Sequence, residues 1–154
     1  TTASFVPTVS QWGTKTILLP AGTNRISFKG ISAYGNNLYI DNVRLAEVPP
    51  CLAPSNVSVA SSGISARGAS VSWNAPSSAP ANGYGLFVST TNSAPAAGAA
   101  ATSNAASSPA VLSGLTPNTT YYVWVRSLCA FNSSDWAGGV AFTTSCDTSA
   151  IPFA

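Results

Sequence analysis

The sequence predicts an all-β protein whose main body is a two-layer sandwich, and three observations carry this prediction. Short runs of β-branched and aromatic residues recur roughly every 8 to 12 residues, separated by Gly, Pro, Asn and Ser. Several runs alternate apolar and polar residues, which is the period of a half-buried strand. Hydrophobic residues make up 45% of the chain and charged residues only 6%, so the composition favours a folded protein over a disordered one.

The first 46 residues predict four strands, with turn residues between them at 11–13, 20–24 and 34–37. The segment Arg25–Ile31 alternates strictly, with Ile26 and Phe28 on one side and Ser27 and Lys29 on the other. Four strands are too few to bury a core alone, so we interpret residues 1–46 as the closing strands of a larger sandwich. The expected strands are Phe5–Val9, Lys15–Leu19, Arg25–Ile31 and Leu38–Leu45.

Residues 47–50 form the expected linker, Glu-Val-Pro-Pro. Two consecutive prolines favour a stiff, extended connection.

Residues 51–145 predict a complete second domain. Its strand spacing, over about 95 residues, is typical of an immunoglobulin-like sandwich. The Ala-rich stretch 95–108 contains Gly98 and lacks apolar periodicity, so we expect a loose edge strand and a loop there rather than a helix. The expected strands are Asn56–Ala60, Ala69–Trp73, Tyr84–Ser89, Ala110–Leu112, Thr119–Leu128 and Val140–Thr144.

The reactive side chains needed for catalysis are scarce. The chain has no His, and its acidic residues are Asp41, Glu47, Asp135 and Asp147, which lie in separate segments. Triads, Cys-His pairs and His-based metal sites are therefore excluded, and a carboxylate pair has few candidates. We expect no enzyme. The net charge of +2 is too small for a nucleic-acid partner, and no apolar run is long enough for a membrane span.

A motif near the penultimate strand resembles a known family. Leu115, Pro117, Thr119 and Tyr121 form Leu-x-Pro-x-Thr-x-Tyr, which resembles the tyrosine corner of a fibronectin type III domain. In such a corner the tyrosine hydroxyl bonds to backbone of the preceding turn and fixes the crossover between the two sheets. Trp73 is similar to the buried tryptophan of that family. The resemblance covers about Pro54 to Thr144.

The flanks resemble modules of a second kind. Residues 19–45, LPAGTNRISFKGISAYGNNLYIDNVRL, resemble the C-terminal part of the MAM-like or cleaved-adhesin jelly rolls of secreted Bacteroidetes proteins. Residues 146–154 resemble the start of a following module. The resemblance implies a large extracellular or cell-surface protein of alternating modules, of the kind exported by the type IX secretion system. Its partners would be neighbouring modules, copies of itself in a filament, or a protein or glycan ligand.

The resemblance also implies a disulfide and a metal site. In a fibronectin type III sandwich the start of the first strand and the end of the sixth share a pole, which implies a Cys51–Cys129 bond, with Cys146 left for a downstream partner. The alternative is three free thiols. In similar jelly rolls an Asp at the position of Asp41 can bind a structural Ca²⁺; the alternative is an Asp bonded to nearby backbone. No other cofactor is expected.

Aromatic residues are predicted on the outer face of one sheet. If Tyr121 faces the core, alternation points Tyr122, Trp124 and Arg126 outward, next to Phe87 on the neighbouring strand. Such a stripe can stack on sugar rings or bind a protein partner. It can also simply stabilise the sheet or receive a neighbouring module, and we favour this second interpretation.

Taken together, the sequence predicts a non-catalytic structural or adhesive segment of a large extracellular bacterial protein: a stalk, an adhesin repeat or part of a surface filament. The alternative is an accessory carbohydrate-binding segment of a secreted hydrolase.

Overall fold

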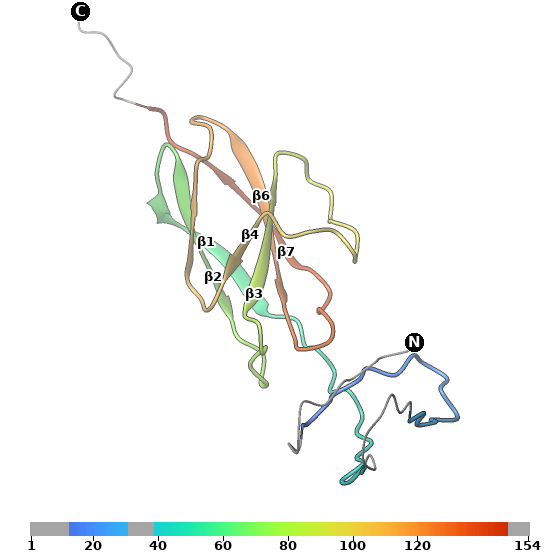
Figure 1. Cartoon of the computed structure of the whole chain (residues 1–154). Coiled ribbons are helices and arrows are strands. Elements are labelled where there is room, and N and C mark those ends of the chain that lie inside the picture. The colour runs from blue at the N-terminus through green and yellow to red at the C-terminus, as the bar shows by residue number, and fades with distance from the viewer. Residues whose placement is uncertain (1–12, 31–38, 148–154) are drawn as a thin grey trace, which may run out of the picture. The chain divides into compact units, whose positions relative to one another are not determined.

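A computed structural model describes residues 13–30 and 39–147, and the chain divides into two compact units, Thr1–Glu47 and Val48–Ala154. The second unit contains all the strands of the described residues (Figure 1). No helix occurs in these residues, so the described part of the chain contains no segment that could cross a membrane as a helix.

The strands predicted in the first unit are not present in its described residues. Residues 13–30 and 39–47 have no regular structure apart from the predicted turn, where the backbone N–H and hydroxyl of Thr23 both donate to the Pro20 carbonyl. A strand needs a partner for its backbone groups and a facing layer for its side chains. Large side chains of the segment stay exposed instead, among them Phe28 at 60% and Tyr39 at 71%. The expected strand Phe5–Val9 lies outside the described residues, as does most of the expected module start at 146–154.

The described residues of the second unit, 48–147, form seven strands, and those predicted from sequence are present with shifted ends. The Ala-rich stretch forms the short edge strand β4 and a loop, as expected. The strands are β1 (Ser55–Ile64), β2 (Gly68–Asn74), β3 (Tyr84–Ser89), β4 (Ser103–Ala105), β5 (Ala110–Ser113), β6 (Thr120–Ser127) and β7 (Ala137–Thr143).

These strands form two antiparallel sheets, which Figure 1 shows as the two layers of a sandwich. The smaller sheet has the order β1-β2-β5 and the larger has β4-β3-β6-β7. β6 is an inner strand with a continuous ladder to β3, from Ser89↔Tyr122 to Tyr84↔Ser127. β1 is an edge strand whose ladder to β2 is interrupted by two register shifts. β6 is therefore held by more backbone hydrogen bonds than β1.

The core lies between the two sheets and follows the predicted alternation. Trp73 and Tyr84 meet edge to face with their ring centroids 5.0 Å apart, and they close one end of the core. The buried apolar residues are Ala69, Val71, Trp73, Tyr84, Leu86, Leu112, Val123, Val125 and Phe142. These residues come from β2, β3, β5, β6 and β7, while β1 and β4 contribute only partly buried residues at the margin of the core: Val57, Val59, Ile64 and Ala105.

Candidate functional site

The tyrosine-corner residues occupy the turn before β6. The Tyr121 hydroxyl accepts a hydrogen bond from the backbone N–H of Thr116 at 3.0 Å, and its ring stacks on Phe142 of β7. The pKa of Tyr121 lies below its usual value of 10.0, mainly because the Thr116 side chain and then the Thr116 backbone form hydrogen bonds with the phenol. Desolvation acts in the opposite direction and raises this pKa. Leu115 packs against the core, and the Thr119 hydroxyl donates to the Pro117 carbonyl at 2.9 Å. The turn is therefore fixed to both β6 and β7.

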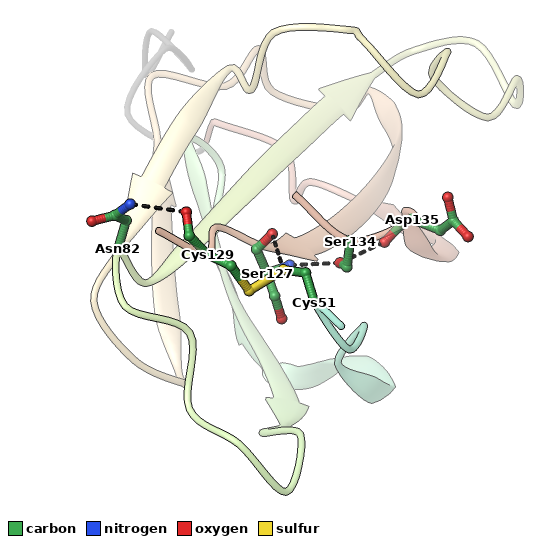
Figure 2. Close-up of a disulfide and its surroundings, with 6 residues drawn as sticks. All are labelled: Cys51, Asn82, Ser127, Cys129, Ser134 and Asp135. Atoms are coloured by element: carbon green, nitrogen blue, oxygen red, sulfur yellow. Dashed lines mark hydrogen bonds between the residues drawn. A yellow bond between two sulfur atoms is a disulfide. The ribbon is translucent and has the colours of Figure 1, made fainter. Parts of the chain in front are cut away.

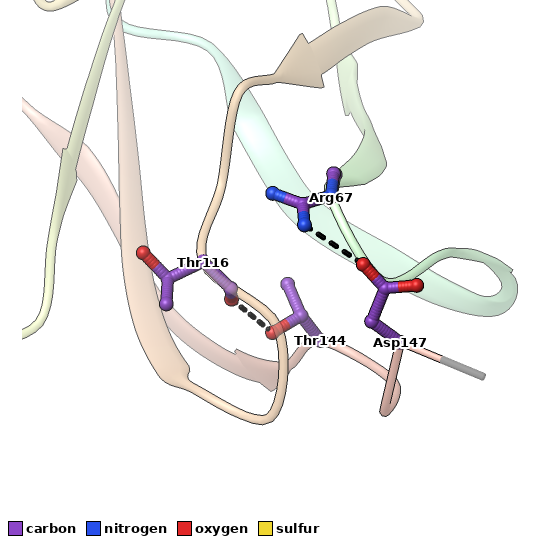
Figure 3. Close-up of polar contacts among 4 residues, drawn as sticks. All are labelled: Arg67, Thr116, Thr144 and Asp147. Carbon is purple, nitrogen blue, oxygen red and sulfur yellow. Dashed lines mark hydrogen bonds and ion pairs between the residues drawn. The ribbon is translucent and has the colours of Figure 1, made fainter. Parts of the chain in front are cut away.

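A residue that sequence reasoning missed, Thr144, completes this pole. It is 2% exposed, and its Oγ1 donates to the Thr116 carbonyl at 2.7 Å (Figure 3). The same Oγ1 accepts from the Thr119 N–H at 3.0 Å. One hydroxyl thus ties the end of β7 to the turn before β6. A threonine just after a strand carries no distinctive sequence signal, so only the fold reveals its role.

Two further contacts fix the chain where it leaves the sandwich. The backbone N–H of Ser145 donates to the Ser65 carbonyl at 3.2 Å, in the turn between β1 and β2. Arg67 of the same turn pairs with Asp147 at 2.8 Å (Figure 3). The Arg67 side chain is largely exposed, so this ion pair contributes at most about 1 kcal/mol. We call the contacts of Thr144, Ser145 and Asp147 the exit clamp.

The opposite pole holds the predicted disulfide. Cys51, just before β1, is bonded to Cys129, just after β6, with the two Cα atoms 5.9 Å apart. The Cys129 carbonyl accepts from Asn82 at 3.0 Å (Figure 2). Next to the bond, the Ser127 N–H donates to Ser134 Oγ, which in turn donates to the Asp135 carbonyl (Figure 2). Cys146 is exposed and forms no disulfide within the chain.

The aromatic stripe lies on the outer face, as alternation predicted, but it is not an open surface. Phe87 and Trp124 are cross-strand partners with ring centroids 6.0 Å apart, and Tyr122 lies beside Trp124. Trp124 is only 4% exposed and Arg126 only 9%. The burial of these two residues agrees with the favoured interpretation, in which the stripe stabilises the sheet, while Phe87 and Tyr122 are half-buried.

The Ala-rich loop and Trp136 explain the burial of Arg126, whereas the Trp124 ring packs against Phe87 and Tyr122 and over Gly139 of β7. Arg126 donates from Nη1 to the Ala97 carbonyl at 2.9 Å, and Trp136 donates from Nε1 to the Ala96 carbonyl at 3.2 Å. The Arg126 guanidinium lies 4.3 Å from the centre of the Trp136 ring, and Trp136 also contacts Phe87. We call this arrangement the loop cover. Sequence reasoning missed Trp136 because it lies before β7, outside any alternating run.

Neither Asp41 nor the surface hollows provide a reactive centre in the described residues. Asp41 Oδ1 accepts from the neighbouring Asn42 N–H at 2.7 Å, which is the backbone role considered as its alternative. In residues 13–30 and 39–147, no three His, Cys, Asp or Glu side chains gather closely enough to hold a metal ion. An open hollow next to Trp73, Tyr84 and Ser108 is lined by no carboxylate.

This geometry defines an immunoglobulin-like sandwich with a tyrosine corner. The sequence model of the fibronectin type III domain matches residues 52–140, more than half of the chain, and the chain belongs to this family. No curated protein matches it.

Three solved structures illustrate the likeness. One is the fibronectin type III domain of the human protein called fibronectin type III domain containing protein 3. It is 17% identical to this chain with a TM-score of 0.52, and the match covers 68% of this chain and 95% of that chain. A human collagen alpha-1(XX) domain is 25% identical with a TM-score of 0.47, over 67% and 93%. A two-domain segment of chicken tenascin is 23% identical with a TM-score of 0.45, over 59% and 49%; this chain spans about half its length. At these identities the first likeness supports the fold alone.

Proposed function

We propose that this chain is a structural and adhesive segment of a large extracellular bacterial protein, serving as a stalk, an adhesin repeat or part of a surface filament. The observation that carries the proposal is that the sandwich is fastened at both poles. The disulfide holds the end where the chain enters, and the exit clamp holds the opposite end. A domain whose two ends are held to its core keeps the modules before and after it at a fixed separation. Its neighbouring modules in the same polypeptide would be its first partners.

The extracellular setting is supported by the disulfide and by the composition. Disulfides persist in oxidising compartments and are rare in the cytosol of most organisms. The low charge and the Ser, Thr and Asn surface fit a secreted protein, and we propose export by a type IX secretion system of Bacteroidetes.

We extend the proposal to residues 1–46, as the closing strands of a MAM-like jelly roll whose other strands belong to an upstream part of the protein. The support is the number of large apolar side chains left exposed in this segment, because such surface normally marks a missing contact. In that setting Asp41 would be free to bind a structural Ca²⁺. The exposed side chains are Ile17, Leu18, Leu19, Ile26, Phe28, Tyr39, Ile40, Val43 and Leu45.

The second candidate, a carbohydrate-binding segment of a secreted hydrolase, has weaker support. Stacking on a sugar ring needs an open aromatic face, and Trp124, which packs against Phe87 and over Gly139, is only 4% exposed. Only the half-buried Phe87 and Tyr122 remain for such a role.

A binding experiment separates the two candidates. The chain is labelled and applied to a glycan array, beside a Tyr122→Ala variant and a Val111→Ala control that removes an exposed side chain on the other sheet. We expect no specific glycan signal from any of the three. Saturable binding that survives Val111→Ala and disappears with Tyr122→Ala would establish the carbohydrate-binding candidate instead. Circular dichroism of a chain extended upstream tests the jelly roll, which predicts a gain of β-structure in residues 1–46.

A further inference from the structure

The disulfide changes the path by which a pulling force crosses the sandwich. The chain reaches the domain at Cys51, and its first strand, β1, begins four positions later at Ser55. Cys129 lies two positions after the end of β6, so the covalent bond joins the incoming chain to that end of the strand (Figure 2). Between Cys129 and the exit clamp, the only strand is β7.

We propose that tension crosses this domain through the ladder between β6 and β7, and that the disulfide prevents residues 52–128, which include β6, from extending under the force. This inference rests on the proposed role as a segment of an extended extracellular protein. It assigns the disulfide a mechanical function: it limits how far the domain lengthens under load and selects the strand that resists.

The strand that receives the force is better held than the one it bypasses. Without the bond, tension would act on β1, an edge strand whose ladder to β2 is broken by two register shifts. With the bond, tension acts on β6, which is paired on both sides, to β3 and to β7. β6 is also buried on both faces, through Val123 and Val125 inward and Trp124 and Arg126 outward. More contacts must therefore break before the oxidised domain yields.

The direction of the force also favours resistance. β6 ends at the disulfide pole and β7 ends at the exit clamp, since Thr120 at the start of β6 pairs with Thr143 at the end of β7. Pulling the two poles apart slides these antiparallel strands along each other. Their hydrogen bonds lie perpendicular to the strands, so all the bonds of the ladder share the force at once and do not break one after another. At the exit, Thr144 and Ser145 hold the end of β7 to the turns it would leave.

The length released on unfolding follows from the connectivity. In the oxidised domain only the segment from Cys129 to Asp147 can extend, about 60 Å at roughly 3.5 Å per residue. The two cysteines are separated by 78 positions, and reduction adds this hidden segment, about 270 Å at the same length per residue. A dithiol such as dithiothreitol supplies the two electrons and two protons that convert the bond to two thiols.

Single-molecule force spectroscopy tests the inference on the whole chain, with a handle ligated to each end and Cys146→Ser to prevent thiol exchange. We expect the final unfolding step of the sandwich to lengthen by about 270 Å after dithiothreitol, and its rupture force to fall. A Cys51→Ser/Cys129→Ser variant should reproduce the reduced trace without reductant. If that variant does not fold, the oxidised protein is reduced at zero force, its fold is checked by tryptophan fluorescence, and it is then pulled.

A Thr144→Val variant separates the two parts of the claim. It leaves the disulfide intact, so its extension should match that of the oxidised parent while its rupture force is lower. An extension that reductant does not change, or an equal rupture force in both redox states, would overturn the inference. The glycan array tests the proposed function separately, since sugar binding would not alter either mechanical result and a failed mechanical result would not create sugar binding.

Discussion

The hydroxyl of Thr144 provides a sharp test of the exit clamp, because one atom satisfies two backbone groups of the tyrosine-corner turn. Thr144→Val keeps the shape and branching of the side chain but replaces the hydroxyl with a methyl. The Thr116 carbonyl loses its 2.7 Å partner and the Thr119 N–H loses its 3.0 Å partner. Leaving a buried polar group unpaired costs about 1 to 3 kcal/mol. Since these two groups are partly buried, we expect a total loss of about 2 to 3 kcal/mol in the free energy of unfolding.

Thr143→Val is the matched control, one position earlier, where the exposed Thr143 is the last residue of β7. Its hydroxyl meets only that of Thr120, at 2.9 Å on the surface. We expect a change within about 0.5 kcal/mol, the usual range for surface substitutions. Urea unfolding followed by tryptophan fluorescence measures both variants, and at about 4 to 8 °C per kcal/mol the melting temperature of Thr144→Val should fall by roughly 10 to 20 °C. Equal stabilities for the two variants would refute the reasoning.

Three other variants probe the rest of the domain. Cys51→Ser/Cys129→Ser should lower the free energy of urea unfolding by about 2 to 4 kcal/mol, whereas Cys146→Ser should leave it unchanged, because only the former opens the closed loop. Trp136→Phe should cost roughly 1 to 2 kcal/mol in the same assay, because it removes the hydrogen bond to the loop and weakens the contact with the guanidinium; a neutral result would argue against the loop cover. Tyr121→Phe should remove a phenol that ionises below its usual pKa of 10.0 in absorbance titration. Because that pKa is lowered on folding, the stability difference from wild type should be larger above pH 10 than at pH 7, and a smaller one would contradict the assignment.

The sandwich could be predicted from sequence because its strands satisfy their own patterns. Ala69–Trp73 places Val71 and Trp73 inward, and both are buried as alternation requires. The first 46 residues show an equally clear alternation, yet their described part forms no strand. Alternation states which face of a strand would be buried, but it does not provide the partner strands or the facing layer. The difference between the two segments is therefore in their surroundings and not in their pattern.

The outer aromatic face shows a second limit of pattern reasoning. Alternation separates two faces of a strand, and it assumes that the outward face of an antiparallel sheet meets water. Here the outward Arg126 of β6 meets the loop cover, whose acceptors are the backbone carbonyls of Ala96 and Ala97, and the outward Trp124 packs over Gly139. Backbone acceptors in a loop leave no mark on the amino-acid sequence. The sequence thus correctly predicted on which face of the sheet the aromatic stripe lies. How much of each side chain is exposed to solvent depends on the surrounding fold and could not be predicted.

The burial of β6 on both faces links stability to the proposed mechanical role. Val125 on the inner face and Trp124 on the outer face are exposed by 0% and 4%, so neither face of this strand can slide freely past its surroundings. The same strand begins at the tyrosine corner and ends beside Cys129, which places a fixed point at each of its ends. An accessible ligand face would require the outer residues to be uncovered, and a resistant strand requires them to be covered. The burial of Trp124 and Arg126 meets the second requirement and not the first, which supports the proposal of a force-transmitting module over that of a sugar-binding one.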